Sequence, residues 1–223
     1  MRKKILAMAA MLGVGIFTAP LPNFNYCEAA EVQNVAQVYD LHFDSSIGVE
    51  KTLTYNGKEI NFTAYENIVY VRNPKNAESQ KLSIYIPTAY LHGGMINGYA
   101  ARTAPIFVPN GVGGYMPGEI KPPSENDRMT HGANTTLAAL SRGYVVVSPA
   151  IRGRTTTTNG EYVGKAPALI VDYKAAVRYL RYNKNALPAG HIDKIISNGT
   201  SAGGALSAAL ATMGNAPEFE PYL

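Results

Sequence analysis

Short, almost exclusively apolar runs alternate with longer amphipathic segments after Pro87, and this alternation constrains the fold more than any other feature. Three such runs occur, each short enough for a single strand: residues 104–108, 144–148 and 194–197. Strands that are apolar on both faces are typical of a parallel sheet whose faces are covered by helices. The pattern therefore predicts an α/β fold with right-handed crossover connections.

The segments that separate and follow these runs have helical patterns. We expect a short helix over residues 136–141, ending at Gly143, and a longer one over residues 166–183. In the longer segment, apolar residues recur on one face: Ile170, Tyr173, Val177 and Leu180. Residues 202–213 are rich in alanine, which favours a third helix.

The residues before Pro87 alternate between apolar and polar, as half-buried strands do. Residues 51–55 and 58–65 flank Asn56-Gly57, which is a strong signal for a β-hairpin. Residues 68–71 and 81–86 are expected to form further strands. The chain therefore combines an N-terminal hairpin with the α/β segment.

The third apolar run leads directly into Gly199-Thr200-Ser201-Ala202-Gly203 and then into the alanine-rich helix. A G-x-S-x-G sequence between a strand and a helix is typical of the nucleophile elbow of serine hydrolases. Ser201 would be the catalytic nucleophile, and Gly199 and Gly203 would be the elbow glycines because a Cβ at either position would collide with neighbouring backbone. The N–H of Ala202 would be the first oxyanion donor. The alternatives are a glycine-rich helix start with an idle serine, or a phosphate site that lacks the P-loop lysine.

The second oxyanion donor should come from the loop after an earlier strand. Two loops compete, His92-Gly93-Gly94 and residues 109–115. The second directly follows the first apolar run, so Gly113 or Gly114 is the expected donor and His92 is expected to be an ordinary loop residue.

A proton acceptor for Ser201 is missing from the expected place. In this fold the acidic residue and the histidine follow the serine along the chain. After Ser201 the chain contains Glu218 and Glu220 but neither Asp nor His. All its histidines come earlier, and the last of them, His191, should begin the strand at its far end: His42, His92, His131 and His191. We therefore expect the N-terminal part of a longer enzyme, with a sheet that is incomplete on its C-terminal side. A pseudoenzyme, or a chain that receives its base from a partner, is the alternative.

The first residues have the order of a secretory signal peptide: basic residues at 2–4, an apolar run over residues 5–17, and a small-residue stretch over residues 27–30 with cleavage expected after Ala29. Removal of residues 1–29 takes away three basic residues and Glu28. The net charge of +4 then falls to +2, from 17 basic and 15 acidic residues. We expect a secreted or periplasmic protein without nucleic-acid partners or stable membrane insertion. A lipid anchor on Cys27, or an uncleaved signal anchor, is the alternative.

Eight segments resemble bacterial tannases: residues 87–93, 97–99, 104–106, 109–115, 142–147, 151–156, 166–187 and 198–205. The similarity as a whole extends from about residue 67 to the C-terminus. Tannases are serine esterases of the α/β-hydrolase fold that cleave galloyl esters. The resemblance implies a mostly parallel sheet, Ser201 as nucleophile, and Gly114 with Ala202 as oxyanion donors. It also implies a small phenolic ester as substrate, with no cofactor and no metal.

The expected organisation is thus a signal peptide over residues 1–29, an extension with the hairpin over 30–66, and the N-terminal part of an α/β-hydrolase domain over 67–223. The tannase Asp, His, lid and gallate-binding residues all follow the elbow and have no counterpart here. Arg152 and Arg154 match the tannase pattern in a polar loop, where they are expected to anchor the loop. The competing functional hypothesis is a non-catalytic secreted binding protein of the same fold.

Overall fold

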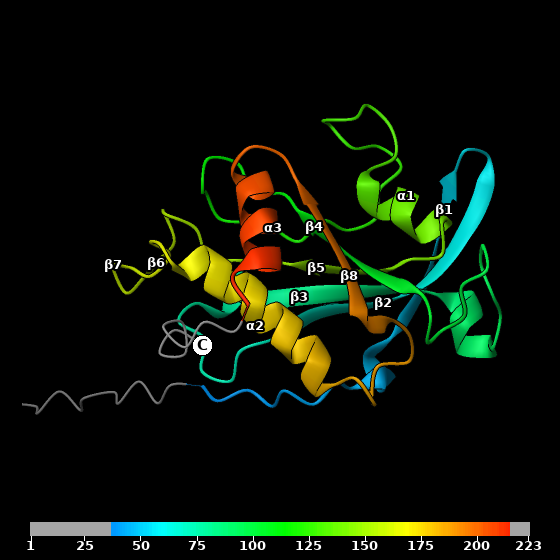
Figure 1. Ribbon diagram of the computed structural model, residues 1–223, viewed down its shortest axis with the longest axis horizontal. Helices are drawn as coiled ribbons and strands as arrows, with labels where there is room; N and C mark the ends of the chain where they lie inside the picture. Colours follow the sequence, from blue (N-terminus) through cyan, green and yellow to red (C-terminus); the bar gives the residue numbers. More distant parts are fainter. Residues whose placement is uncertain (1–36, 215–223) are drawn as a thin grey trace, which may run out of the picture. The chain divides into compact units, whose positions relative to one another are not determined.

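A six-stranded mixed sheet forms the centre of residues 37–214, which are the residues that this computed structural model describes (Figure 1). In spatial order its strands are β1 (Val49–Tyr55), β2 (Lys58–Val69), β3 (Lys81–Pro87), β5 (Val145–Pro149), β4 (Pro105–Asn110) and β8 (His191–Gly199). The expected signal peptide, Glu218 and Glu220 lie outside the described residues.

The sheet has an antiparallel half and a parallel half. β1, β2, β3 and β5 pair antiparallel, whereas β5, β4 and β8 pair parallel. The α/β class is as expected, but three of the five strand pairings in this sheet are antiparallel, so the sheet is mixed rather than mostly parallel. β1, β2 and β3 follow one another through short connections, which favour antiparallel neighbours. The antiparallel pairing of β3 with β5 instead joins strands that are far apart in the sequence.

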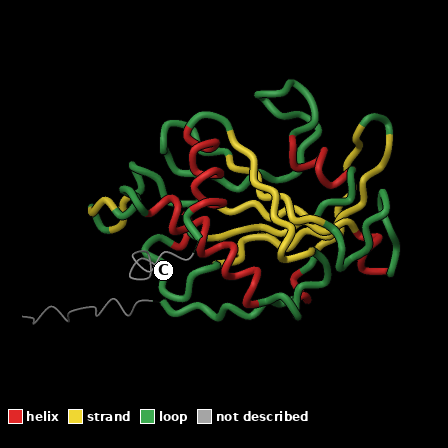
Figure 2. The backbone as a smooth tube through the Cα atoms, viewed as in Figure 1, coloured by secondary structure: helices red, strands yellow, loops and turns green. Residues whose placement is uncertain are grey.

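Three α-helices cover the two faces of this sheet (Figure 2): α1 (Thr135–Ser141), α2 (Ala168–Tyr182) and α3 (Ala202–Thr212). Side chains of β4 alternate between the faces. Ile106 and Val108 pack in the core formed with α2 and α3, while Phe107 packs in the smaller core with α1. The strands predicted from the three apolar runs and the three predicted helices are present.

Two predicted strands differ in detail from the structure. Residues 68–71 do not form a separate strand: Ile68 belongs to the end of β2, beyond a bulge at which Asn67 has a φ of 61°. β8 is not buried on both faces as β4 and β5 are. Ile196 of β8 is 41% exposed, and β8 is one of the two edge strands of the sheet in residues 37–214.

The remaining short elements lie in the connections. The hairpin turn has positive φ at both central residues, 50° at Asn56 and 74° at Gly57, as a type I′ turn requires. Three 3₁₀ turns and a two-stranded ribbon complete the secondary structure of residues 37–214: η1 (Ser45–Ile47), η2 (Ala77–Ser79), η3 (Thr88–His92), β6 (Thr157–Thr158) and β7 (Glu161–Tyr162). Every helix in residues 37–214 is too short or too polar to cross a bilayer.

Candidate active site

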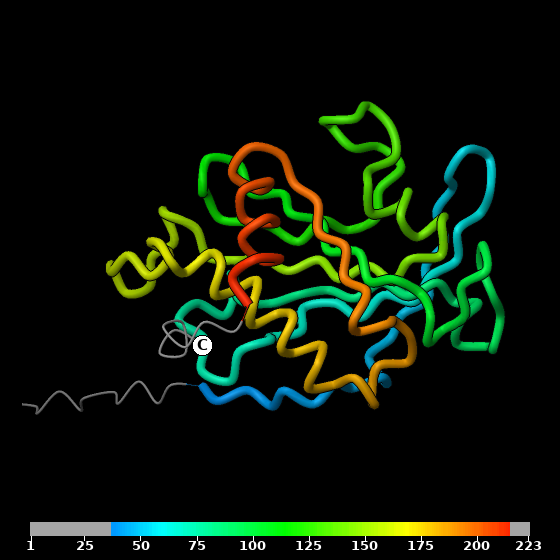
Figure 3. The backbone as a smooth tube through the Cα atoms, viewed as in Figure 1, coloured from blue at the N-terminus to red at the C-terminus, as the bar shows by residue number. Residues whose placement is uncertain are grey.

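A sharp turn joins β8 to α3 (Figure 3). Ser201 occupies this turn. β8 ends at Gly199 and α3 begins at Ala202, so only Thr200 and Ser201 lie between strand and helix. Ser201 has a φ of 56° and a ψ of −125°, a backbone conformation that costs a residue with a Cβ on the order of 1–3 kcal/mol. The residue is exposed, and within residues 37–214 its hydroxyl forms no hydrogen bond. The turn thus presents a serine hydroxyl to solvent.

The two glycines that flank Ser201 allow this turn to form. A Cβ on Gly199 would lie 2.5 Å from the carbonyl carbon of Gly203 and 3.0 Å from the carbonyl oxygen of Asn110. A Cβ on Gly203 would lie 2.8 Å from that same Asn110 oxygen. The ends of β8 and β4 and the first turn of α3 therefore touch through their backbones, which is the steric requirement expected from the sequence.

The chain after β4 forms a glycine-rich loop over residues 111–118, called the glycine loop below. It lies beside this turn because β4 and β8 are parallel neighbours, with Asn110 opposite Gly199. Gly113 and Gly114 are exposed, and Gly114 has a φ of 55°. Ala202 is the first residue of α3, so its N–H has no acceptor within the helix. Gly113, Gly114 and Ala202 therefore belong to segments that meet at one edge of the sheet, and their role as oxyanion donors stays a prediction.

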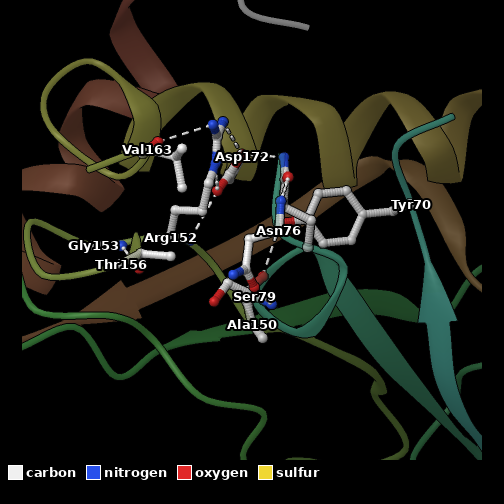
Figure 4. Close-up of polar contacts among 10 residues, drawn as sticks. Tyr70, Asn76, Ser79, Ala150, Arg152, Gly153, Thr156, Val163 and Asp172 are labelled. Carbon is white, nitrogen blue, oxygen red and sulfur yellow. Dashed lines mark hydrogen bonds and ion pairs between the residues drawn. The ribbon is translucent and has the colours of Figure 1, made fainter. Parts of the chain in front are cut away.

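A buried ion pair anchors the neighbouring loop after β5 (Figure 4). Arg152 Nη2 lies 2.7 Å from Asp172 Oδ1, and Arg152 Nε donates to both oxygens of that carboxylate. Gln80 Nε2 donates to Asp172 Oδ1 at 2.9 Å. Burial raises the pKa of Asp172, and the hydrogen bonds and positive charge of Arg152 counteract this effect.

The anchored loop in turn supports the glycine loop. The N–H of Arg154 donates to the Tyr115 carbonyl at 2.9 Å, and Gly118 and Ile151 exchange two backbone hydrogen bonds. A Cβ on Gly153 would lie 2.1 Å from Pro117 N, so the two loops are in direct backbone contact. The placement of Arg152 agrees with the expected loop anchor, whereas the Arg154 side chain is exposed and its Nε contacts Met116 Sδ.

None of the four histidines contacts Ser201 within residues 37–214. His191 begins β8, so a rise of about 3.3 Å per residue places it more than roughly 20 Å from the turn. His92 ends η3, His131 lies in a turn, and His42 contacts Asp40 at 2.7 Å near Tyr182. The same residues contain no cluster of three or more His, Cys, Asp or Glu that could hold a metal ion.

One residue of the site was not anticipated from the sequence. The buried side chain of Asn110, at the end of β4, forms hydrogen bonds to both α3 and the glycine loop. The only sequence signal was its position, directly after a buried strand and before the glycines.

Solved structures that this chain is similar to include bacterial tannases. The Fusobacterium nucleatum tannase is 50% identical with a TM-score of 0.80, over 83% of this chain and 38% of that one. A Lactobacillus plantarum tannase is 47% identical with a TM-score of 0.77, over 82% of this chain and 39% of that one. A tannin acyl hydrolase in complex with ethyl gallate is 46% identical with a TM-score of 0.74, over 82% of this chain and 40% of that one.

A family model described as BD-FAE matches residues 113–223, and no curated protein matches significantly. Judged by the coverages above, the chain spans about two fifths of the length of the tannases that it matches. The resemblance to bacterial tannases and the α/β-hydrolase fold, both expected from the sequence, are confirmed.

Proposed function

We propose that the protein is a carboxylic-ester hydrolase of the tannase type, with Ser201 as its nucleophile. The observation that carries this proposal is the backbone conformation of Ser201. An exposed serine with a φ of 56° sits between a strand and a helix, held there by two glycines that have no room for a Cβ. Such a conformation costs free energy and presents a hydroxyl at the end of a sheet, which is what an ester hydrolase requires of its nucleophile.

The proposed reaction proceeds in two steps. Ser201 Oγ attacks the ester carbonyl carbon, and the carbonyl oxygen takes the negative charge. The N–H groups of Ala202 and Gly114, with Gly113 as the alternative to Gly114, stabilise this charge. Collapse of the tetrahedral intermediate expels the alcohol and leaves an acyl ester on Ser201, which water then hydrolyses.

The proton of Ser201 has to pass to a base. No titratable side chain within residues 37–214 contacts Ser201, and the described histidines lie elsewhere. We propose that a histidine from outside these residues supplies the base. The support is that the chain spans only about two fifths of the length of the tannases that it matches.

The proposed substrate is an ester of a small phenolic acid, such as a galloyl ester. Its support is the structural neighbour that was crystallised in complex with ethyl gallate. Export is proposed as well, on the basis of the signal-peptide pattern of residues 1–29, which lie outside the described part of the chain.

Hydrolysis of methyl gallate by the protein as its gene encodes it tests the proposal. Ser201→Ala should lower kcat by several orders of magnitude, because the nucleophile is removed. Ser141→Ala, which removes a hydroxyl bonded to the Ala138 carbonyl on α1, should keep the wild-type rate. If Ser201→Ala is as active as the wild type, the proposal is wrong.

A second candidate function follows from the missing base. A non-catalytic binding protein of the same fold would also show no base near Ser201 in residues 37–214. It would bind methyl gallate without hydrolysing it, and Ser201→Ala would leave the affinity unchanged. The same preparations therefore distinguish the two functions.

A further inference from the structure

Asn110 lies where the three segments of the candidate site meet. It is the last residue of β4, it pairs with Gly199 of β8, and it is 6% exposed. A Cβ on either Gly199 or Gly203 would approach its carbonyl oxygen within 3.0 Å. Its backbone therefore already touches both sides of the turn that holds Ser201.

The carboxamide of Asn110 connects the first turns of α3 with the glycine loop. Its Nδ2 donates to the Gly203 carbonyl at 2.9 Å and to Ser207 Oγ at 3.2 Å, and its Oδ1 accepts from the Val112 N–H at 3.3 Å. The Ser207 hydroxyl in turn lies 2.9 Å from Ser197 Oγ of β8. One buried amide thus links the helix that begins at Ala202 to the loop that contains Gly113 and Gly114.

The relative position of these two segments is what an oxyanion site depends on. The two proposed donors sit on separate segments, one on α3 and one on the glycine loop. An oxyanion is stabilised only where both N–H groups are close to the same point in space. Because charge develops on that oxygen in the transition state, a shift of one donor should reduce kcat more than it changes KM.

We propose that Asn110 is a positioning residue that sets the distance between the oxyanion donors of Ala202 and the glycine loop. This inference rests on the proposed function and adds to it a residue that contacts neither the nucleophile nor the reacting atoms. A hydrophobic or shorter side chain would leave the Gly203 carbonyl and the Val112 N–H without their link.

The test compares Asn110→Ala with the matched variant Asn183→Ala in the protein as its gene encodes it, with methyl gallate as substrate. Asn183 is also a buried bridging amide: it accepts from the Phe43 N–H and donates to the carbonyls of Leu41 and Tyr179. It lies at the C-terminal end of α2, from which the chain leads to the start of β8, away from Ser201. Both variants lose a comparable buried hydrogen-bonding group.

Asn110→Ala should lower kcat by about 10²-fold, as misplacement by about 1 Å can do, with KM changed less than threefold. Asn183→Ala should keep the wild-type kcat even if its melting temperature falls as far as that of Asn110→Ala. Asn110→Asp, which retains the acceptor for Val112 N–H but loses the donor to Gly203, covers the case in which the alanine variant does not fold. It should show the same loss in kcat.

Three outcomes would overturn the inference: wild-type kcat in a folded Asn110 variant, a loss confined to KM, or an equal loss of kcat in Asn183→Ala. Ser201→Ala, measured alongside, separates this failure from that of the proposed function. If Ser201→Ala is inactive while Asn110→Ala keeps the wild-type kcat, only the inference about Asn110 is wrong.

Discussion

Ser201 and its glycine neighbours show how a costly backbone conformation is maintained. The positive φ of Ser201 is unfavourable in isolation, so the surrounding contacts must supply the free energy that holds it. Those contacts are backbone to backbone, between Gly199, Gly203 and Asn110, and they leave no space for a side chain. The identity of the two glycines is therefore fixed by packing at the turn.

Gly199→Ala should destabilise the protein. The added Cβ would lie 2.5 Å from the backbone of Gly203, which cannot move without displacing α3. We expect the free energy of unfolding to fall by about 1–3 kcal/mol, measured by urea denaturation. The control is Gly132→Ala, since nothing lies within 4 Å of a Cβ at that position. Equal stability of the two variants would contradict the steric account.

At this scale the sequence predicted the glycines but not Asn110. The spacing of Gly199, Ser201 and Gly203 carries the geometry of the turn with it, because each residue must satisfy a local backbone requirement. The contacts of Asn110 join residues 93 and 97 positions apart, to Gly203 and Ser207, and no local pattern encodes them.

Among the elements, the loop after β5 owes its position to one buried ion pair. Asp172 on α2 is fully buried and receives hydrogen bonds from Arg152 and Gln80. The loop that Arg152 anchors then contacts the glycine loop through Arg154, which donates to the Tyr115 carbonyl, and through Ile151, which pairs with Gly118. The ion pair thus supports the candidate site without lying in it.

Asp172→Ala should cost about 3–5 kcal/mol of the free energy of unfolding, because it leaves Arg152 buried without its partner. The double variant Asp172→Leu with Arg152→Met should recover much of this loss, since a buried pair replaced by apolar residues is often neutral. Thermal and urea denaturation measure both effects.

The exposed pair Lys51–Glu66, 2.8 Å apart, provides the comparison. Glu66→Gln should change the free energy of unfolding by less than about 1 kcal/mol, because solvent screens exposed ion pairs. A cost for Asp172→Ala as small as this would show that the buried pair does not hold the loop.

The sequence predicted elements well where one local pattern decided them. β4 and β5 are buried apolar runs, and the Asn56-Gly57 hairpin has its own turn signal. The predicted end of β2 was wrong. The sequence pattern suggested two strands, but β2 continues as one strand past a bulge at Asn67. The pairing of Arg152 with Asp172 could not be predicted, because it depends on how α2 packs against the loop.

For the described part of the molecule as a whole, buried tyrosines predict sensitivity to alkaline pH. Burial raises the pKa of Tyr85 to about 12 and that of Tyr90 to about 12, from a usual value of 10.0. Between pH 10 and about pH 12, these tyrosines keep their protons in the folded state and lose them in the unfolded state. The free energy of unfolding should therefore fall as the pH rises above about 10, by about 1.4 kcal/mol per pH unit for each such tyrosine.

Urea denaturation at pH 9, 10 and 11 measures this slope, and Tyr85→Phe should reduce it by the share of one tyrosine. A free energy of unfolding that stays constant from pH 10 to 11 would contradict the assigned burial.

The order of the strands in the sheet could not be predicted from the sequence. The apolar runs indicated which strands are buried, but not that β3 would pair antiparallel with β5. The exposure of β8 likewise depends on which neighbours its outer edge has, and the sequence of β8 does not determine that.

The central claim is that Ser201 is a reactive nucleophile, and covalent labelling tests it most directly. The protein as its gene encodes it is treated with an alkyl fluorophosphonate, with and without methyl gallate, and the labelled peptide is identified by mass spectrometry. We predict a single phosphonyl group on Ser201, formed more slowly when methyl gallate is present. Label on another serine, or an unmodified Ser201 in folded protein, would contradict the account.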